Sequence, residues 1–415
     1  MTRRRNPSRG DFRYRDPFPA RFYGNILIKG QGIFPFPPGH FAGRAGPIHN
    51  VHLVNRLILY YQDDESGFPV KRSLITGPIF EYHNRPGHIE CYDRLRAITE
   101  QLPEGIPVRP PLAATEVDLK RVHLPGYLSW LHRQCALHTA YDTVDEYGCI
   151  GGYFTGNTYV PGFLDANTYL NPRSYEVATF AAGSAIAATE RVLDGESCFA
   201  LVRPPGHHAA SDWAMGFCII NNTAIAAAKA LTSVDRVAIV DWDVHHGNGT
   251  QDIFYGSDRV LYCSVHAEDF FPGTGAATDT GTGAGAGCTV NAPLPQKSTI
   301  GDYVHVFSDL FLPLLKRAHP DLVIVSAGQD ALADDPVGGM GLLPVDYGTL
   351  AGLLLDALDL PPAFVLEGGY GPSHPAAINA ILGAVSGKRS SEPVPEPSAG
   401  ARERVRILRK LHGLR

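Results

Sequence analysis

RVAIVDWDVHHGNGTQD, residues 236–252, is the stretch that decides the fold expected for this chain. It opens with the apolar run Val237-Ala238-Ile239-Val240, which is typical of a strand buried on both faces of a parallel sheet. Acidic and imidazole side chains follow at once, and the glycines after them end the strand. Because open α/β sheets present reactive groups at the carboxyl ends of their strands, the stretch predicts a metal site at such an edge.

Short apolar segments alternate with helical segments from residue 73 onward. Strands are predicted at residues 198–202, 237–241, 259–265, 321–326 and 362–366, and helices at 175–193, 222–231, 304–317 and 347–358. Strands and helices that alternate through right-handed crossovers form a parallel sheet covered on both faces. The predicted fold class is therefore α/β, a single parallel sheet with helices on both faces and catalytic loops at the strand carboxyl ends.

Composition divides the rest of the chain. Residues 1–17 are polar and Arg-rich, which predicts a disordered basic N-terminus. Residues 18–72 mix aromatic and aliphatic side chains with Gly and Pro, including a predicted strand at 55–61, and are expected to pack on a catalytic domain at 73–387. Residues 388–415 are a Pro-rich linker and a short basic segment with helical spacing. That segment could dock on its own domain or on a second subunit, or stay a solvated tail, and a homo-oligomer formed through either extension is left open.

Overall composition is that of a globular enzyme: 44% of the 415 residues are hydrophobic and 19% are charged. A net charge of -6 gives no general attraction to nucleic acid or to anionic membranes. The seven scattered cysteines form no C-x-x-C pair, and the chain has neither a long apolar run nor a secretory signal. We therefore expect a cytoplasmic protein without a membrane or direct nucleic acid partner.

Several predicted strands end in polar side chains. These are His207 and His208 after 198–202, His266 after 259–265, Gln329 and Asp330 after 321–326, and Glu367 and Tyr370 after 362–366. Since the carboxyl ends of parallel strands meet at one edge of the sheet, the sequence predicts one crevice holding imidazoles, carboxylates and a phenol. Such a set is typical of a catalytic site.

Asp243 and His245 lie two residues apart, so on an extended segment their side chains point to the same side and can bind one metal ion. Asp330, from another strand, would be the third ligand, which leaves a position open for water and substrate. This ligand set suits zinc, although ligand type alone also permits iron, cobalt or manganese. Taken singly, Asp330 could be a helix N-cap, but the convergence of polar groups favours a site.

Six motifs occur in order between about residues 75 and 385. They are RPPGHHA at 203–209, GFC at 216–218 with Asn221-Asn222, the acidic and His-rich run at 241–249, FFPGTG at 270–275, the segment 328–336, and EGGY at 367–370. Together they resemble the zinc-dependent histone deacetylase and acetylpolyamine amidohydrolase superfamily, in its class II-like bacterial deacetylase branch. The resemblance implies the arginase-deacetylase fold and a hydrolase that removes acetyl or other acyl groups from lysine side chains.

The same resemblance implies a role for each motif residue. One Zn²⁺ per chain would be held by Asp243, His245 and Asp330, and a structural K⁺ by Asp241, Asp243 and His245 with Ser264 and Val265. His208, partnered by Asn248, would be the general base and then the general acid for a metal-bound water, and His207 would pair with Asp241. Tyr370 would support the oxyanion. The substrate tunnel would be lined by Gly216, Phe217, Phe271 and Val337.

Two alternative functions compete with this interpretation. A binuclear manganese ureohydrolase shares the fold but needs a carboxylate where this chain has Gly247, so one metal is favoured. A non-catalytic binding module is the other alternative, although every catalytic position is filled. His246 is expected to be structural, and His88-Ile89-Glu90 with Arg94 stands where the superfamily has His-Pro-Glu and a following Arg.

The substrate is the more open question. Apolar Val337 at the expected tunnel mouth favours an acylated lysine over a cationic acetylpolyamine, which would be met by an acid. Glu268 and Asp269 could supply such an acid, so small acylated amines stay open as the alternative substrate class.

Overall fold

The computed structural model describes residues 72–85, 87–137, 152–155, 158–161, 167–359 and 361–414, all within the unit Tyr60–Arg415. The basic N-terminus predicted at 1–17, the strand predicted at 55–61 and the extension predicted at 18–72, except residue 72, lie outside the described residues. None of the described helices combines the length and the apolar character that a bilayer crossing requires.

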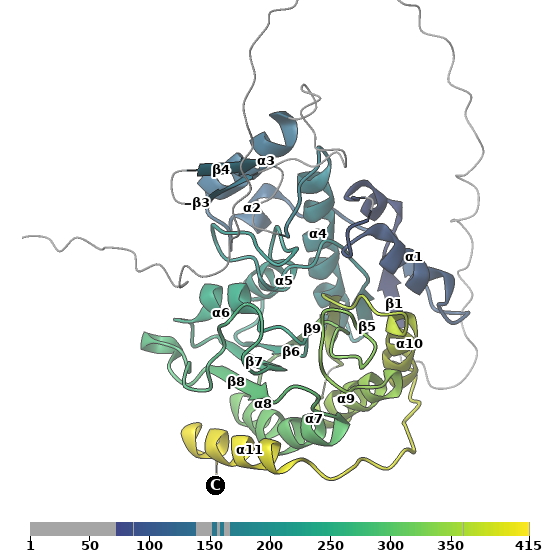
Figure 1. Ribbon diagram of the computed structural model, residues 1–415, viewed down its shortest axis with the longest axis vertical. Coiled ribbons are helices and arrows are strands. Elements are labelled where there is room, and N and C mark those ends of the chain that lie inside the picture. The colour runs from purple at the N-terminus through teal and green to yellow at the C-terminus, as the bar shows by residue number, and fades with distance from the viewer. Residues whose placement is uncertain are drawn as a thin grey trace, which may run out of the picture. The chain divides into compact units, whose positions relative to one another are not determined.

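An eight-stranded sheet lies at the centre of the described chain, and all of its strand pairs are parallel (Figure 1). The strand order is β2-β1-β5-β10-β9-β6-β7-β8. The bounds are β1 Arg72–Ile75, β2 Val108–Arg109, β5 Ser197–Ala200, β6 Val237–Asp241, β7 Val260–Ala267, β8 Thr289–Leu294, β9 Leu322–Ala327 and β10 Ala363–Leu366. This confirms the predicted fold class.

The central strand β6 is buried along its whole length, as its β-branched run predicts. It lies between β7 and β9, and Asp241 at its end is in register with Ser264 of β7 and Ser326 of β9. The five strands predicted from residue 73 onward are the neighbours β5, β10, β9, β6 and β7. Their carboxyl ends therefore lie side by side along one edge.

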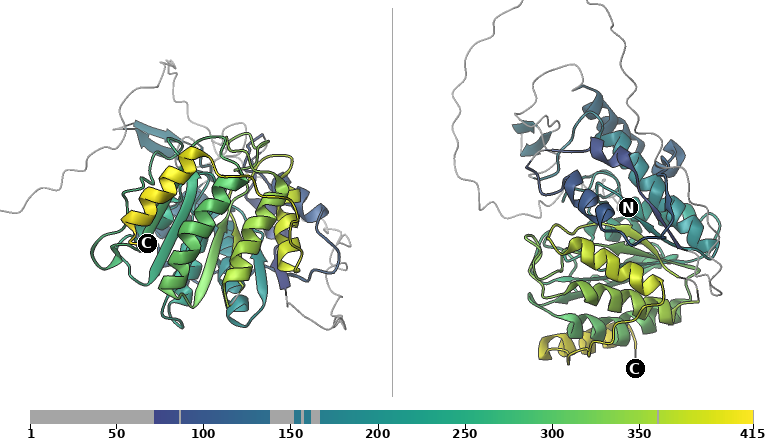
Figure 2. Two further views of the ribbon diagram at one scale, coloured as in Figure 1. Left: turned by 90° about the horizontal axis from the view of Figure 1, so that it is seen from below. Right: turned by 90° about the vertical axis from the view of Figure 1, so that its right-hand side faces the viewer.

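Helices cover both faces of this sheet, as Figure 2 shows. Helices α4 (Ser174–Leu193) and α5 (Asn222–Ala230) pack on one face, and the group that includes α9 (Pro344–Ala357) and α10 (His374–Val385) covers the other. The remaining helical segments are η1 Pro78–Tyr82, α1 Tyr92–Glu100, α2 Glu116–Leu119, α3 Pro125–Leu137, α6 Asn248–Phe254, η2 Gly283–Gly285, α7 Ile300–Val306, η3 Phe307–Phe311, α8 Leu312–Ala318 and α11 Ala399–Leu411. A separate antiparallel pair joins β3 (Gly152–Thr155) to β4 (Thr158–Pro161).

The helix predicted at 304–317 is continuous but contains a π-helical turn, η3, between α7 and α8. Pro313 follows this turn and has no N–H to donate to the Asp309 carbonyl four residues earlier. Arg409 of α11 donates its Nη1 hydrogen to that oxygen instead. The Asp309 carbonyl, which lacks its usual helical donor, thus accepts a hydrogen bond from a residue 100 positions away.

The basic C-terminal segment forms α11 and docks on its own domain. Its residues Ala401, Val405 and Leu408 are buried against α7, η3 and the edge strand β8. Ser398 caps the helix by accepting from the Ala401 N–H at 3.1 Å, and Arg317 Nη1 donates to the His412 carbonyl at 2.7 Å near its end. Of the arrangements left open by the sequence, the structure has the docked one.

Candidate active site

A pocket of about 250 Å³ opens where the carboxyl ends of the five central strands meet. Each strand contributes through the loop that follows it, so the pocket combines residues far apart in the sequence. The lining consists of Asn167, Pro205, His207, His208, Gly216, Phe217, Asp243, His245, Phe270, Phe271, Asp330, Val337, Gly368 and Tyr370. Most of the residues predicted for the catalytic set and the tunnel are therefore brought together.

Asp243, His245 and Asp330 form a compact group of potential metal ligands, with ligand atoms all within 4.8 Å of one another. His245 Nδ1 lies 3.1 Å from Asp243 Oδ1 and 3.1 Å from Asp330 Oδ2. Backbone donors orient both carboxylates: the Gly368 N–H donates to Asp243 Oδ2 at 2.9 Å, and the Val244 N–H to Asp330 Oδ1 at 2.8 Å. A Cβ at Gly368 would lie 2.2 Å from Asp330 Oδ2, so only glycine lets the backbone approach this closely.

The chemistry of this donor set fits a divalent cation. Burial raises the pKa of Asp330 to about 7, and the facing Asp243 carboxylate also raises it. Two buried carboxylates this close repel each other unless a positive charge lies between them. Two oxygen ligands and one imidazole, with one side open to the pocket, match the pattern of a catalytic metal site, in which three protein ligands leave a position for water.

His208 is held as a neutral base facing the pocket. Its Nδ1 lies 2.7 Å from Asn248 Oδ1, and the Asn248 amide nitrogen is directed to the His208 carbonyl and to Met215 Sδ. An amide oxygen only accepts, so we assign the proton to His208 Nδ1, which leaves the Nε2 lone pair free. Burial lowers the pKa of His208 well below its usual value, and the neighbouring His207 and His245 lower it further.

His207 has the opposite character. Its Nδ1 lies 3.1 Å from Asp241 Oδ2, which also accepts from the Tyr262 hydroxyl at 3.0 Å. Burial opposes a charge on His207, but the carboxylates of Asp243 and Asp241 outweigh it and raise the pKa well above its usual value. The pKa values of the two adjacent buried imidazoles are therefore shifted in opposite directions, since His208 faces an amide and His207 faces carboxylates.

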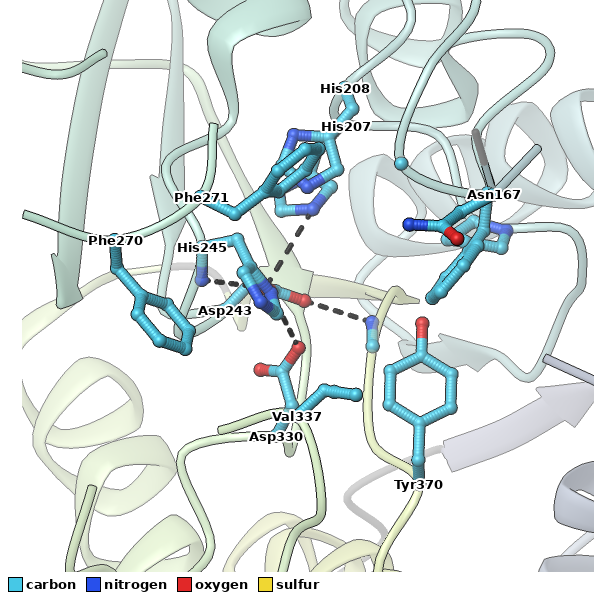
Figure 3. A pocket seen from close by; sticks show the side chains of 14 residues that line it. Asn167, His207, His208, Asp243, His245, Phe270, Phe271, Asp330, Val337 and Tyr370 are labelled. Carbon is cyan, nitrogen blue, oxygen red and sulfur yellow. Dashed lines mark hydrogen bonds and ion pairs between the residues drawn. The ribbon is translucent and has the colours of Figure 1, made fainter. Parts of the chain in front are cut away.

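Tyr370 reaches the pocket from the loop after β10. Burial raises the pKa of its hydroxyl well above the usual value, so the group stays protonated and can donate a hydrogen bond. Its main chain is fixed because the Tyr370 and Gly371 N–H groups donate to Asp335 Oδ2 at 2.6 and 2.9 Å. Figure 3 shows Tyr370 and Asn167 on the side of the pocket opposite Phe270 and Phe271, with the potential metal ligands between them.

Comparisons with known proteins agree with this geometry. The histone deacetylase domain matches residues 88–384. The chain belongs to the histone deacetylase family. It is accordingly a metal-dependent deacetylase, a hydrolase that acts on amides.

Individual relatives cover most of the described chain. The histone deacetylase-like amidohydrolase of Pseudomonas aeruginosa is 38% identical over 322 residues, which are 74% of this chain and 78% of that protein. Histone deacetylase 15 of Arabidopsis thaliana is 38% identical over 331 residues, covering 76% of this chain but only 56% of that longer protein. The crystal structure of the HDA15 HD domain superposes with a TM-score of 0.73 at 31% identity and covers 82% of this chain and 96% of that one.

Aromatic rings form the walls of this deacetylase pocket. Phe271 meets His208 edge to face at 5.2 Å between ring centroids, and Phe270 stacks on His245 at 5.4 Å. Across the pocket, Phe217 meets Tyr370 edge to face at 5.6 Å. The imidazoles are thus packed against apolar surfaces, which keeps water away from them.

Glu367 is buried beneath the pocket and fixes the turn that bears the histidines. Its Oε2 accepts from the N–H groups of Gly206 and His207 at 2.6 and 3.1 Å, and its Oε1 accepts from the Thr223 and Ser326 hydroxyls. Glu367, His207 and Cys218 could in principle hold a metal ion. Since both Glu367 oxygens already accept hydrogen bonds, we interpret the group as structural.

The packing around position 247 explains why a glycine stands there. A Cβ at this position would lie 2.2 Å from Asp241 Oδ2 and 2.5 Å from the Tyr262 hydroxyl. The carboxylate that a binuclear ureohydrolase needs would therefore collide with the partner of His207. This crowding favours a site with one metal ion.

Three predictions about the crevice were wrong, because His266, Gln329 and Glu367 do not line it. His266 lies within β7, where its ring contacts Ser264 and the Gly275 carbonyl, and Gln329 contacts His374 and the Ala327 carbonyl. Strand β7 runs two residues further than expected, so His266 is still inside the sheet. His246, which was expected to be structural, lies outside the lining and contacts Thr274 and Gln251.

Asn167, Pro205, Phe270 and Gly368 line the pocket but were not singled out from the sequence. Asn167 comes from the segment before α4, which contains no motif. Its carbonyl accepts from His88 Nε2 at 3.1 Å, and the next residue, Thr168, accepts the Phe217 N–H at 2.8 Å. Phe270, Pro205 and Gly368 each stand inside a recognised motif, within two positions of a residue that was singled out.

Proposed function

We propose that this deacetylase removes acyl groups from lysine side chains, with one Zn²⁺ per chain held by Asp243, His245 and Asp330. The observation that supports this most is the position of the three ligand side chains beside neutral His208 and the Tyr370 hydroxyl in one aromatic-walled pocket. A bound divalent ion would lower the pKa of water and polarise the amide carbonyl. Acid–base chemistry and oxyanion support are then left to the protein.

The side chains divide that work. His208 Nε2 accepts a proton from the attacking water, and the resulting imidazolium donates a proton to the departing lysine amine. His207, paired through Nδ1 with Asp241, would contribute a positive charge beside the site when it is protonated. The Tyr370 hydroxyl donates to the developing oxyanion. The aromatic walls hold an extended, uncharged acyl-lysine chain and exclude water.

Replacing Asn248 with Asp is expected to move the acid limb of the pH–rate profile upward. A carboxylate 2.7 Å from His208 Nδ1 would favour the imidazolium, raising the pKa of the base by roughly one unit or more. Because the base must be neutral to accept a proton, activity would appear only at higher pH. The measurement is kcat/KM against pH, with metal content determined on the same samples. An unchanged limb, or one shifted to lower pH, would contradict the assignment of His208 as base.

The pocket mouth favours lysine over a free polyamine as the acyl carrier. Val337 is apolar, and Glu268 forms an ion pair with Arg404, so its charge is already compensated. Asp269, exposed beside it, is the acid that would meet a cationic amine. Small acylated amines therefore stay as the second candidate substrate class.

We further propose a structural K⁺ at the backbone carbonyls of Asp241, Asp243 and His245 with Ser264 and Val265. Ser264 Oγ lies 2.9 Å from His266 Nδ1. His266 Nε2 must donate to the Gly275 carbonyl, so in the neutral ring Nδ1 accepts the Ser264 proton. The Ser264 oxygen then keeps its lone pairs for a cation, which supports the proposal.

One set of assays tests both the substrate class and the presence of the metal ion. Acetyl-lysine peptides, longer acyl-lysines and acetylated polyamines are compared on one preparation whose zinc content is measured by mass spectrometry. We expect about one zinc per chain, hydroxamate inhibition, and a higher kcat/KM on lysine substrates. A higher kcat/KM on acetylated polyamines would mean that small acylated amines are the substrates. Absence of both bound metal and hydroxamate affinity would contradict the assignment of the metal site.

A further inference from the structure

One wall of the pocket is a loop, residues 268–275, that follows β7. We call it the wall loop. Phe270 and Phe271 project from it against His245 and His208, so the position of the loop sets the width of the pocket. Immediately before it, the Ala267 N–H donates to the Val244 carbonyl at 2.8 Å, which ties the root of the loop to the segment bearing the metal ligands.

The far end of the wall loop is held by two buried histidines. His266 Nε2 donates to the Gly275 carbonyl at 3.1 Å. His246 Nε2 donates to Gln251 Oε1 at 3.0 Å, so its Nδ1 is free to accept the Thr274 hydroxyl at 2.8 Å. Burial, together with the nearby charge of Arg404, lowers the pKa of His266 to about 4. These contacts lie entirely inside the matched catalytic region.

The near end of the wall loop is held by a residue that lies outside the matched deacetylase domain. Glu268, its first residue, forms an ion pair with Arg404 of α11, and both side chains are partly exposed. The matched deacetylase domain ends at residue 384, whereas α11 begins at Ala399. Arg404 is itself fixed because α11 is docked by the buried Val405 and Leu408 and by the hydrogen bond from Arg409 to the Asp309 carbonyl.

We propose that Arg404 is a positioning residue for the substrate pocket, holding the wall loop through Glu268 so that Phe270 and Phe271 stay against the site imidazoles. The inference rests on the proposed function, because it takes the acyl chain to lie along this wall. It makes the C-terminal helix part of the substrate-binding apparatus. Release of α11 would loosen substrate binding without removing any residue that contacts the reacting atoms.

The test compares Arg404→Gln and Glu268→Gln with Arg406→Gln, a matched control on the same helix whose arginine pairs with exposed Glu403 of that helix. Both test variants are expected to raise KM for an acyl-lysine peptide about 3- to 5-fold, the upper part of the range for losing one partly exposed ion pair, with kcat and zinc content unchanged. Hydrogen exchange of residues 268–276 should become faster in both, because local opening exposes those amides. The exchanged pair Arg404→Glu with Glu268→Arg should restore both readouts.

Arg404 has no positioning role if its variant behaves like Arg406→Gln in both KM and hydrogen exchange. The same conclusion follows if kcat and KM change together with a loss of zinc, which would indicate general destabilisation. If the wild-type protein hydrolyses no acyl substrate, the proposed function fails, but the exchange rates of residues 268–276 still decide whether Arg404 holds the loop.

Discussion

Tyr370→Phe is expected to lower kcat by about 10²- to 10³-fold, the usual cost of removing one oxyanion donor. The substitution removes only the hydroxyl. The ring keeps its contact with Phe217 and its place under the Arg94 guanidinium, 4.6 Å from the ring centroid. The backbone stays fixed by Asp335. Because the hydroxyl acts in the transition state, kcat and kcat/KM should fall together, with KM nearly unchanged.

The measurement is steady-state kinetics on an acetyl-lysine peptide, with zinc content and hydroxamate affinity determined in parallel. Tyr175→Phe is the control, since Tyr175 lies on α4 away from the pocket lining and should keep full activity. Retention of more than about a tenth of the wild-type kcat would mean that Tyr370 does not stabilise the oxyanion, and would favour a role in packing.

The strands that bear the site could be predicted because their sequences are almost entirely apolar. Val237–Asp241 was predicted with the bounds that β6 has, and β7 differs from its prediction by one residue at the start and two at the end. Strands buried on both faces require nearly continuous apolar runs, which stand out in a sequence. The short strands β1 and β2 and the edge strand β8 were not predicted, and β8 contains Pro293, which is unusual in a strand and is tolerated at the sheet edge.

Strand order and the contacts between distant loops could not be predicted. The placement of β10 between β5 and β9 depends on pairing across more than a hundred residues, which no local pattern records. The ion pair of Glu268 with Arg404 is of the same kind. The sequence allowed Glu268 to be a free acid at the pocket mouth, and only the docking of α11 shows that its charge is compensated.

A buried ion network behind the pocket is another feature that the sequence did not predict. Glu90 is fully buried and lies between two guanidinium groups. Arg203 donates from Nε and Nη2 to its two oxygens at 2.9 and 2.6 Å, and Arg94 Nη1 donates at 3.2 Å. Arg94 also donates from Nε to the Gly369 carbonyl at 2.9 Å, beside Tyr370. The network therefore connects the start of the matched domain to the catalytic loop.

Glu90→Gln is accordingly expected to lower the free energy of unfolding by about 3–5 kcal/mol, the usual cost of breaking a buried ion pair from one side. Glutamine keeps the shape but removes the charge, which leaves Arg203 buried without a compensating carboxylate. Chemical denaturation at pH 7 measures the loss. Glu116→Gln is the control, since Glu116 pairs with Lys120 on the exposed side of α2, where an ion pair contributes little.

The pH dependence of this loss gives a second, independent check. Burial alone would raise the pKa of Glu90, but Arg203 and Arg94 outweigh it and lower the pKa from 4.5 to about 2. A carboxyl group with a lowered folded pKa stabilises the fold fully above its unfolded pKa, and this contribution is lost as the pH falls toward the folded value. The difference between wild type and Glu90→Gln should therefore be constant above pH 4.5 and narrow between pH 4.5 and 2. A loss below about 1 kcal/mol at pH 7, or a difference that widens on acidification, would show that Glu90 is not the charge that balances the two arginines.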